Sequence, residues 1–234
     1  MIKLQAQSQP EFFWFNQFLH KKVEQYYAQG DRQILISKQP KVAIVGSRCM
    51  TPYGHTILRQ IIPALARQNI TIVSGGAFGV DLEAQKLALE YDAKVVTILG
   101  SGLHNPAPKT NAKFFEQVAK RGALISQYEP DFPATRYTFP ERNRLISAMS
   151  DLIIVIEARA KSGALITADF ALQQGKPIAC FPGRITDELS AGTNLLIQQG
   201  AHPILNTQDI FELLGITQKE VNNPVQQTLQ ELYS

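Results

Sequence analysis

The chain has 234 residues, a formal net charge of +3, 44% hydrophobic residues and 18% charged residues. This balance excludes a disordered protein and describes a globular one, with enough residues for one large or two small domains. No secretory signal and no apolar run near eighteen residues is visible, so we expect a soluble, cytoplasmic protein with no membrane partner. The only two cysteines, Cys49 and Cys180, cannot form a zinc site alone, and we expect no metal and no cofactor.

The first segment, residues 1–37, is rich in aromatic residues. Its central stretch, "FFWFNQFLHKKVEQYYAQG", suggests a helix, and we expect an N-terminal helical cap packed on the core. The main domain is predicted over residues 38–215. The polar residues 216–234 are expected to form a C-terminal tail or the remnant of a linker, since they are too short for a domain.

Short, continuous runs of β-branched and other apolar residues recur through the main domain. Continuous runs, unlike alternating ones, indicate strands that are buried on both faces, as in a parallel sheet. They lie at 41–46, 70–74, 94–99, 151–157 and 176–182, with weaker candidates at 123–126 and 202–205. Amphipathic segments of helical length lie at 53–68, 79–91, 111–121, 140–150 and 163–174. The alternation predicts an α/β fold, with a mostly parallel, doubly wound sheet flanked by helices.

Glycine and serine follow four of the predicted strands, in "GSRCMTPYG", "SGGAFGVD", "GSGLHNP" and "RAKSGALIT". Small residues let a ligand approach the backbone, and the helix N-termini that follow favour anions, so these segments predict a ligand that carries phosphate. Neither a P-loop nor a dinucleotide-binding glycine motif is present. Arg48, in the first of these turns, can bind a phosphate with two N–H groups. The alternative is a surface arginine or a helix ion pair.

Residues 134–144, "ATRYTFPERNR", interleave cations with aromatic rings ahead of a predicted helix. Such a mixture suits a single strand of nucleic acid, because rings stack on bases and cations follow the phosphates. We therefore expect Arg136 and Phe139 to face a ligand. For Tyr137 and Arg144 a structural role is equally favoured. In that alternative the rings of Tyr137 and Phe139 pack under the sheet, and Arg142 or Arg144 pairs with Glu141 or Asp151.

No catalytic arrangement stands out. His104 follows a predicted strand but has neither a serine elbow nor a cysteine to support it, and Asp81 is expected to cap its helix or to tie the "SGGAFG" loop rather than act as a base. We therefore predict that the protein is not an enzyme.

Taken in order, the motifs resemble those of the DNA-processing protein A family (DprA, also called Smf). The resemblance covers residues 38–205 and rests on "VAIVGSR", "TPYG", "IVSGGAFGVDLEAQKLAL", "TILGSGL", "GALISQYEP", "FPERNRLISAMSD", "IVIEARAKSGALITADFALQQGKPI", "FPG" and "GTNLLIQQGA". It implies an extended Rossmann-like fold and a homodimer that binds single-stranded DNA. It also implies a role in natural transformation, in which the protein protects incoming DNA and helps to load the RecA recombinase.

The resemblance also implies positions for the DNA-binding residues. Carried over to this sequence, they are Ser47, Arg48, Gly75, Gly76, Arg136, Phe139, Arg142, Lys161, Ser162 and Gly163. The segment of the dimer contact includes Leu195, Leu196 and Ile197, which core packing explains equally well.

The sequence departs from the family pattern at the second glycine turn, where Phe78 stands in place of a frequent cation and is either a stacking or a packing residue. The segments on either side of the core are too short to match the extra domains that many members carry.

The alternative function is a nucleoside-monophosphate phosphoribohydrolase of the Lonely Guy-like group, which has a similar helix and glycine turn. Here the double glycine of that turn is missing, and Asp169 stands nearest to the expected glutamate. A protein-interaction scaffold would leave the arginines and glycines after the strands unexplained.

Overall fold

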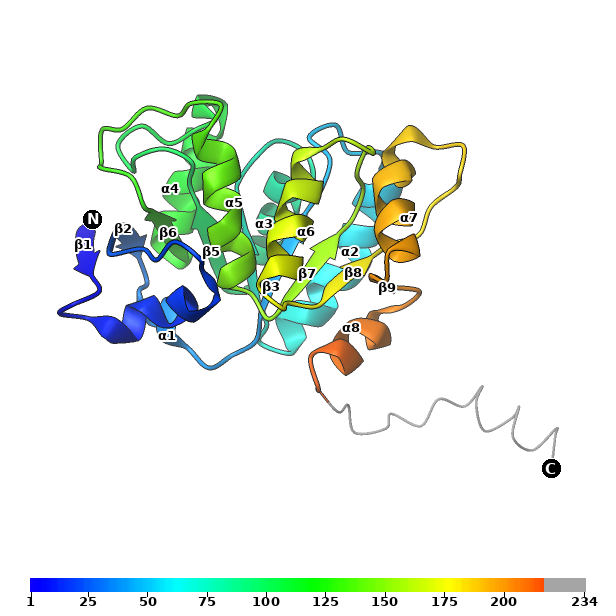
Figure 1. The fold of residues 1–234 in the computed structure, drawn as a ribbon, viewed down its shortest axis with the longest axis horizontal. Helices are drawn as coiled ribbons and strands as arrows, with labels where there is room; N and C mark the ends of the chain where they lie inside the picture. The colour runs from blue at the N-terminus through cyan, green and yellow to red at the C-terminus, as the bar shows by residue number, and fades with distance from the viewer. Residues whose placement is uncertain (217–234) are drawn as a thin grey trace.

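The computed structural model describes residues 1–216, which contain one mixed sheet of nine strands (Figure 1). The strand order is β1-β2-β6-β5-β4-β3-β7-β8-β9. All pairs from β6 to β9 are parallel, whereas β1–β2 and β2–β6 are antiparallel. The strands are β1 (Ile2–Gln5), β2 (Gln25–Gly30), β3 (Lys41–Val45), β4 (Thr71–Ser74), β5 (Val95–Ile98), β6 (Ala123–Ser126), β7 (Leu152–Val155), β8 (Ile178–Cys180) and β9 (His202–Pro203). This confirms the predicted α/β fold.

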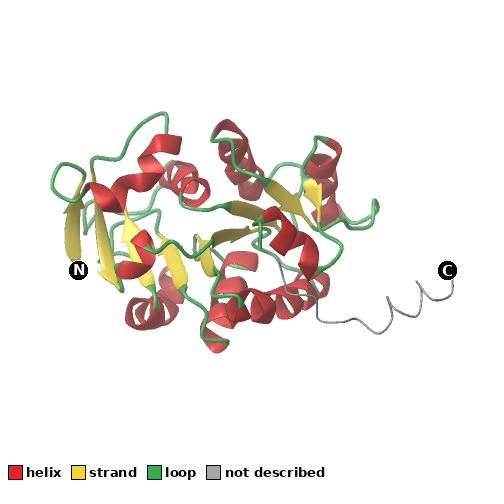
Figure 2. Cartoon of the chain, turned by 90° about the horizontal axis from the view of Figure 1, so that it is seen from below, coloured by secondary structure: helices red, strands yellow, loops and turns green. Residues whose placement is uncertain are grey.

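Helices cover both faces of the sheet (Figure 2). One face carries α2 (Pro52–Arg67), α3 (Val80–Glu90), α4 (Ala112–Arg121) and α8 (Thr207–Leu213). The other carries η1 (Pro10–Phe18), α1 (Gln33–Ile36), α5 (Thr138–Ala148), α6 (Gly163–Gln173) and α7 (Ala191–Gln198). Two short 3-10 turns, η2 (Lys109–Asn111) and η3 (Glu188–Ser190), precede α4 and α7.

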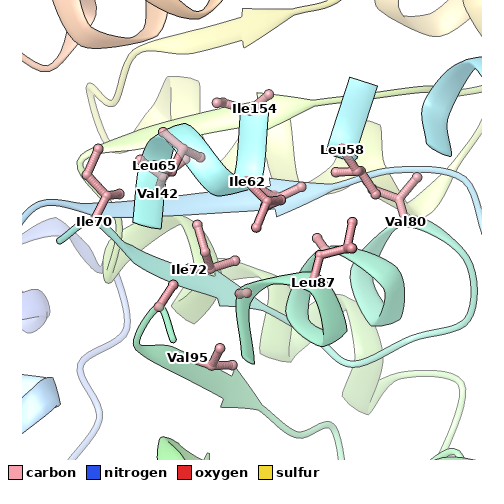
Figure 3. Packing of buried hydrophobic residues seen from close by; sticks show 14 of the residues in the cluster. Val42, Leu58, Ile62, Leu65, Ile70, Ile72, Val80, Leu87, Val95 and Ile154 are labelled. Atoms are coloured by element: carbon pink, nitrogen blue, oxygen red, sulfur yellow. The ribbon is translucent and has the colours of Figure 1, made fainter. Parts of the chain in front are cut away.

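The apolar runs of the central strands supply both layers of core. In β3, Val42 and Ile44 point into the α2–α3 layer, while the intervening Ala43 and Val45 point into the α5–α6 layer. Figure 3 shows Val42 beside Leu65 of α2 among the buried residues of this layer. Burying an aliphatic side chain of this size contributes about 1.5–3 kcal/mol, so strands buried on both faces hold the two helical layers together.

The strand order reverses at β3, which lies between β4 and β7. From β3 the chain runs through β4 and β5 to β6, and then returns across the sheet to β7 on the other side of β3. At such a reversal the loops that leave neighbouring strands diverge, and a crevice opens outside the carboxyl ends. The fold therefore places the first and fourth glycine turns next to each other.

The prediction of a helical N-terminal cap was wrong for residues 2–5 and 25–30, which form β1 and β2 and extend the sheet beyond β6. The aromatic pair in "QYYAQG" follows the two-residue period of a strand, because Tyr26 packs into one core layer and Tyr27 into the other. The residues between the strands form the short helix η1, whose Phe12, Phe13 and Phe15 are buried.

The predicted tail, apart from Ile216, lies outside the described residues. The boundaries of the main domain, residues 38–215, remain a prediction from the sequence. Among residues 1–216, no helix combines the length and the hydropathy that crossing a membrane requires.

Candidate nucleic-acid interface

A groove of about 650 Å³ opens beyond the carboxyl ends of β3 and β7 and is walled by residues of α5 and α6. The structure thus brings together residues that lie more than 100 positions apart in the sequence. Of the ten predicted DNA-binding residues, the groove is lined by Ser47, Arg48, Arg136, Phe139, Arg142, Ser162 and Gly163.

Arg48 and Phe139 meet inside the groove. The guanidinium carbon of Arg48 lies 5.8 Å from the centre of the Phe139 ring, within the range of a cation–π contact. Arg48 is exposed and Phe139 is half-buried. A guanidinium held against a ring still presents its in-plane N–H groups, so this pair offers a phosphate donor next to a stacking surface.

The turn that carries Arg48 is held on both sides. The Ser47 N–H donates to the Glu157 carbonyl at 2.8 Å, and the Ser47 carbonyl accepts from the Val80 N–H at 3.1 Å. The buried Ser47 hydroxyl accepts from the Cys49 N–H at 3.1 Å. The Glu157 carboxylate in turn accepts from the backbone N–H and the hydroxyl of Thr51, the N-cap of α2. Ser47 therefore fixes the backbone from which Arg48 projects.

At the floor of the groove lie two buried ionisable side chains, Arg142 and Asp81, which are 4% and 7% exposed and both bind the backbone of Gly75. Arg142 Nη1 donates to the carbonyls of Gly75 (2.7 Å) and Ile98. Burial lowers the pKa of Arg142 to about 10, against the opposing effect of the Asp81 charge, so Arg142 stays charged at neutral pH. Burial raises the pKa of Asp81, while Arg142 and several hydrogen bonds act to lower it.

Asp81 also ties the glycine turn after β4, as expected from the sequence, because its Oδ2 accepts from the Gly75 N–H at 3.1 Å. A Cβ at Gly75 would overlap the Arg142 guanidinium, which explains why glycine is needed there. Gly75 and Gly76 are themselves buried and do not line the groove, which at this point is lined by Ala77. The two glycines therefore shape the groove from below.

Asn143 links the two helices of the groove. Its Oδ1 accepts from Arg142 Nε at 3.1 Å, and its Nδ2 donates to the Gly163 carbonyl at 3.3 Å. Ser162 is the N-cap of α6, and its hydroxyl is buried without a hydrogen-bond partner among the described residues. The start of α6 thus presents the positive end of a helix to an anion.

The other cations of "ATRYTFPERNR" divide between two roles. Arg136 is exposed on the rim, with its guanidinium carbon 4.6 Å from the centre of the Tyr137 ring, which is itself 65% exposed. Arg144 pairs with Glu141 at 3.2 Å and donates to the Lys21 carbonyl at 2.8 Å. The ion-pair alternative therefore holds for Arg144, while Tyr137 is not packed under the sheet.

Two basic residues differ from the prediction in whether they line the groove. Lys161 is exposed but does not line the groove. Arg159, which the sequence reasoning missed, does line it and pairs with Glu188 at 3.3 Å. Arg159 comes directly after a strand exit, so the rule that selected Arg48 would have found it too.

The three candidate dimer residues lie on α7. Leu196 is buried in the core, Ile197 is partly buried against it, and Leu195 is exposed. Core packing thus accounts for Leu196, and a dimer contact through Leu195 stays a prediction.

The features of a hydrolase are not brought together. Asp169 is exposed on α6 and does not line the groove. Within residues 1–216, no group of three or more His, Cys, Asp or Glu residues is arranged to hold a metal ion.

Comparison with known proteins agrees with the fold and identifies the family. The model of the DNA recombination-mediator protein A family matches residues 9–215. The DNA processing protein DprA of Bacillus subtilis is 36% identical over 188 residues, which are 80% of this chain and 63% of that protein. The chain spans between 44% and 64% of the length of its curated relatives.

Two solved structures share the fold over most of the chain. DprA from Streptococcus pneumoniae has a TM-score of 0.84 and 31% identity, covering 90% of this chain and 73% of that one. DNA processing protein A from Helicobacter pylori, whose structure is described as showing a single-stranded DNA binding mode, has a TM-score of 0.80 and 35% identity, covering 86% and 91%. With the family model matched over nearly all the described residues, the chain belongs to the DNA recombination-mediator protein A family, the DprA/Smf proteins.

Proposed function

We propose that the protein binds single-stranded DNA in the groove, with phosphates on Arg48 and Arg136 and a base stacked on Phe139. The observation that carries the proposal is the Arg48 guanidinium 5.8 Å from the Phe139 ring in an open groove. A cation beside a ring supplies both halves of single-strand recognition, contact with the backbone and stacking of the base. The single-stranded DNA binding mode described for the Helicobacter pylori protein supports the same ligand here.

Membership of the family supports the proposal of a wider role. We propose that the protein acts in the cytoplasm as a homodimer, protects incoming DNA and helps to load RecA during natural transformation. In this role it binds and hands over DNA and catalyses no reaction of its own. The exposed Leu195 on α7 is the candidate dimer contact.

Hydrolysis of nucleoside monophosphates has less support. The residue nearest the expected glutamate, Asp169, is exposed and lies outside the groove lining, and the buried Asp81 accepts a hydrogen bond from the Gly75 N–H. Incubating the protein with nucleoside monophosphates and measuring free base by chromatography tests this alternative. Release of base above the buffer control would favour it.

The first test is fluorescence anisotropy of a labelled oligothymidylate, titrated with protein over a series of salt concentrations. Since each phosphate contact on a single strand adds about −0.7 to the slope of log K against log[salt], a groove with several cations should give a slope of about −2 or steeper. An unlabelled duplex should compete poorly, because its bases are not available for stacking on Phe139.

Arg48→Ala should weaken binding about 10- to 100-fold, the factor that corresponds to losing a charge-assisted hydrogen bond of about 1.5–3 kcal/mol. Arg67→Ala is the matched control, since Arg67 is an exposed arginine at the opposite end of α2. If the Arg48 variant and the wild type bound with equal affinity, the groove would not be the DNA-binding site. Equal competition by duplex would contradict single-strand recognition.

A further inference from the structure

Exposed aromatic side chains gather at one end of the sheet. Five large aromatic side chains are exposed among residues 1–216. Tyr53, Phe78, Phe132 and Tyr137 all lie on segments that follow the carboxyl ends of β3, β4 and β6, and only Tyr91 lies elsewhere, at the end of α3. The groove opens at that same end, so these rings and the proposed strand-binding site share one end of the sheet.

Phe78 is placed there by a rigid turn. Gly76 and Gly79, with φ of +62° and +73°, bracket it, and a Cβ at Gly79 would overlap the Ser47 carbonyl. The Val80 N–H donates to that same carbonyl at 3.1 Å. Because the backbone on both sides is fixed, the outward direction of the Phe78 ring is imposed by the fold and does not depend on ligand.

The ring has no evident packing role. Phe78 is 45% exposed, and within the described part of the chain neither buried core cluster includes it. Its neighbour Ala77 lines the groove, and Gly79 touches the backbone of Arg48. A ring that is partly exposed offers a flat apolar surface, and a nucleobase is flat and fits such a surface.

We propose that Phe78 stacks a base of the single strand directly outside the groove, next to the nucleotide that Arg48 and Phe139 bind. The inference rests on the proposed function and extends it, because it makes the binding site longer than the groove. Phe78 stands where the family pattern often has a cation, so a base stacked on its ring would take the place of a phosphate bound by a charge. The contribution of Phe78 should therefore depend on bases and not on salt, in contrast to that of Arg48.

The test compares Phe78→Ala with the wild type on two ligands, an oligothymidylate of twelve nucleotides and an abasic deoxyribose-phosphate chain of the same length. At low salt, where binding to the backbone alone is measurable, Phe78→Ala should weaken binding to the oligothymidylate about fivefold or more. Its binding to the abasic chain should match that of the wild type. Tyr91→Ala is the matched control, since Tyr91 is also 45% exposed but lies at the other end of α3.

Three results are decisive. A loss on the oligothymidylate alone, constant across the salt series and with unchanged urea unfolding, supports the inference. No loss on either ligand, or an equal loss on both, overturns it, since the ring would then contribute nothing or act through the backbone. Failure of the wild-type protein to bind oligothymidylate would instead refute the proposed function, which separates the two outcomes.

Discussion

Replacing Asp81 by Asn tests the buried pair beneath the groove. Asparagine keeps an oxygen for the Gly75 N–H, so the change removes chiefly the charge that faces Arg142. Removing one partner of a buried ion pair in direct contact costs about 3–5 kcal/mol, and a counter-charge that acts without such contact contributes less. Since Asp81 acts on Arg142 through its charge without a direct ion pair, and Arg142 keeps its bonds to the carbonyls of Gly75 and Ile98, we expect a loss of about 2 kcal/mol. That is a large part of the 5–15 kcal/mol by which domains are usually stable.

The assay is urea unfolding followed by fluorescence, with Asp169→Asn as the control, since Asp169 is an exposed carboxylate on α6. The control should lie within about 0.5 kcal/mol of the wild type. In Asp81→Asn/Arg142→Met the two losses should not add, because the second change removes the charge that the first left unpaired. A loss below about 1 kcal/mol in Asp81→Asn would refute the reasoning, since it would show that Arg142 needs no counter-charge at this site.

Three further predictions follow from the same region and from the core. Gly79→Ala should lower the free energy of unfolding by about 1–3 kcal/mol, measured in urea, because its backbone has a positive φ and its Cβ would overlap the Ser47 carbonyl; unchanged stability would contradict this. Glu188→Gln should tighten binding of oligothymidylate up to about fivefold at low salt by releasing Arg159, since an exposed pair is worth about 0–1 kcal/mol; weaker binding would show that Glu188 serves another purpose. Burial raises the pKa of the Cys180 thiol from 9.0 to about 12, so the unfolded state loses its proton first and stability should fall as pH rises between these values. Unfolding measured against pH should show a smaller fall in Cys180→Val.

The central sheet was predictable because its strands are buried on both faces. The runs at 41–46, 70–74, 94–99 and 151–157 contain β3, β4, β5 and β7, and the glycines and serines between them marked the correct edge of the sheet. β1 and β2 were missed because they are antiparallel strands at the edge of the sheet, and their polar, glutamine-rich sequences lack the apolar run that marks a central strand.

The sequence predicted residues that line the groove, but not which of them would be buried. Arg48, Arg136 and Arg142 look alike in sequence, yet two are exposed and Arg142 is buried against the carbonyls of Gly75 and Ile98. That difference arises from the return of the chain to β7, which lays α5 over the glycine turn after β4. Sequence spacing carries no information about which arginine will lie underneath.

The shortness of β9 has a consequence for how copies of the protein can meet. β9 is the outer strand beside β8 in the described part of the chain, and it consists of two residues, of which Pro203 has no N–H to donate. Exposed strand edges are templates on which a second chain can continue a sheet, and short strands and proline block that route. Association of two copies at this end of the molecule would therefore have to proceed through side chains on helices and loops, which can be specific and reversible in a way that open-ended sheet growth is not.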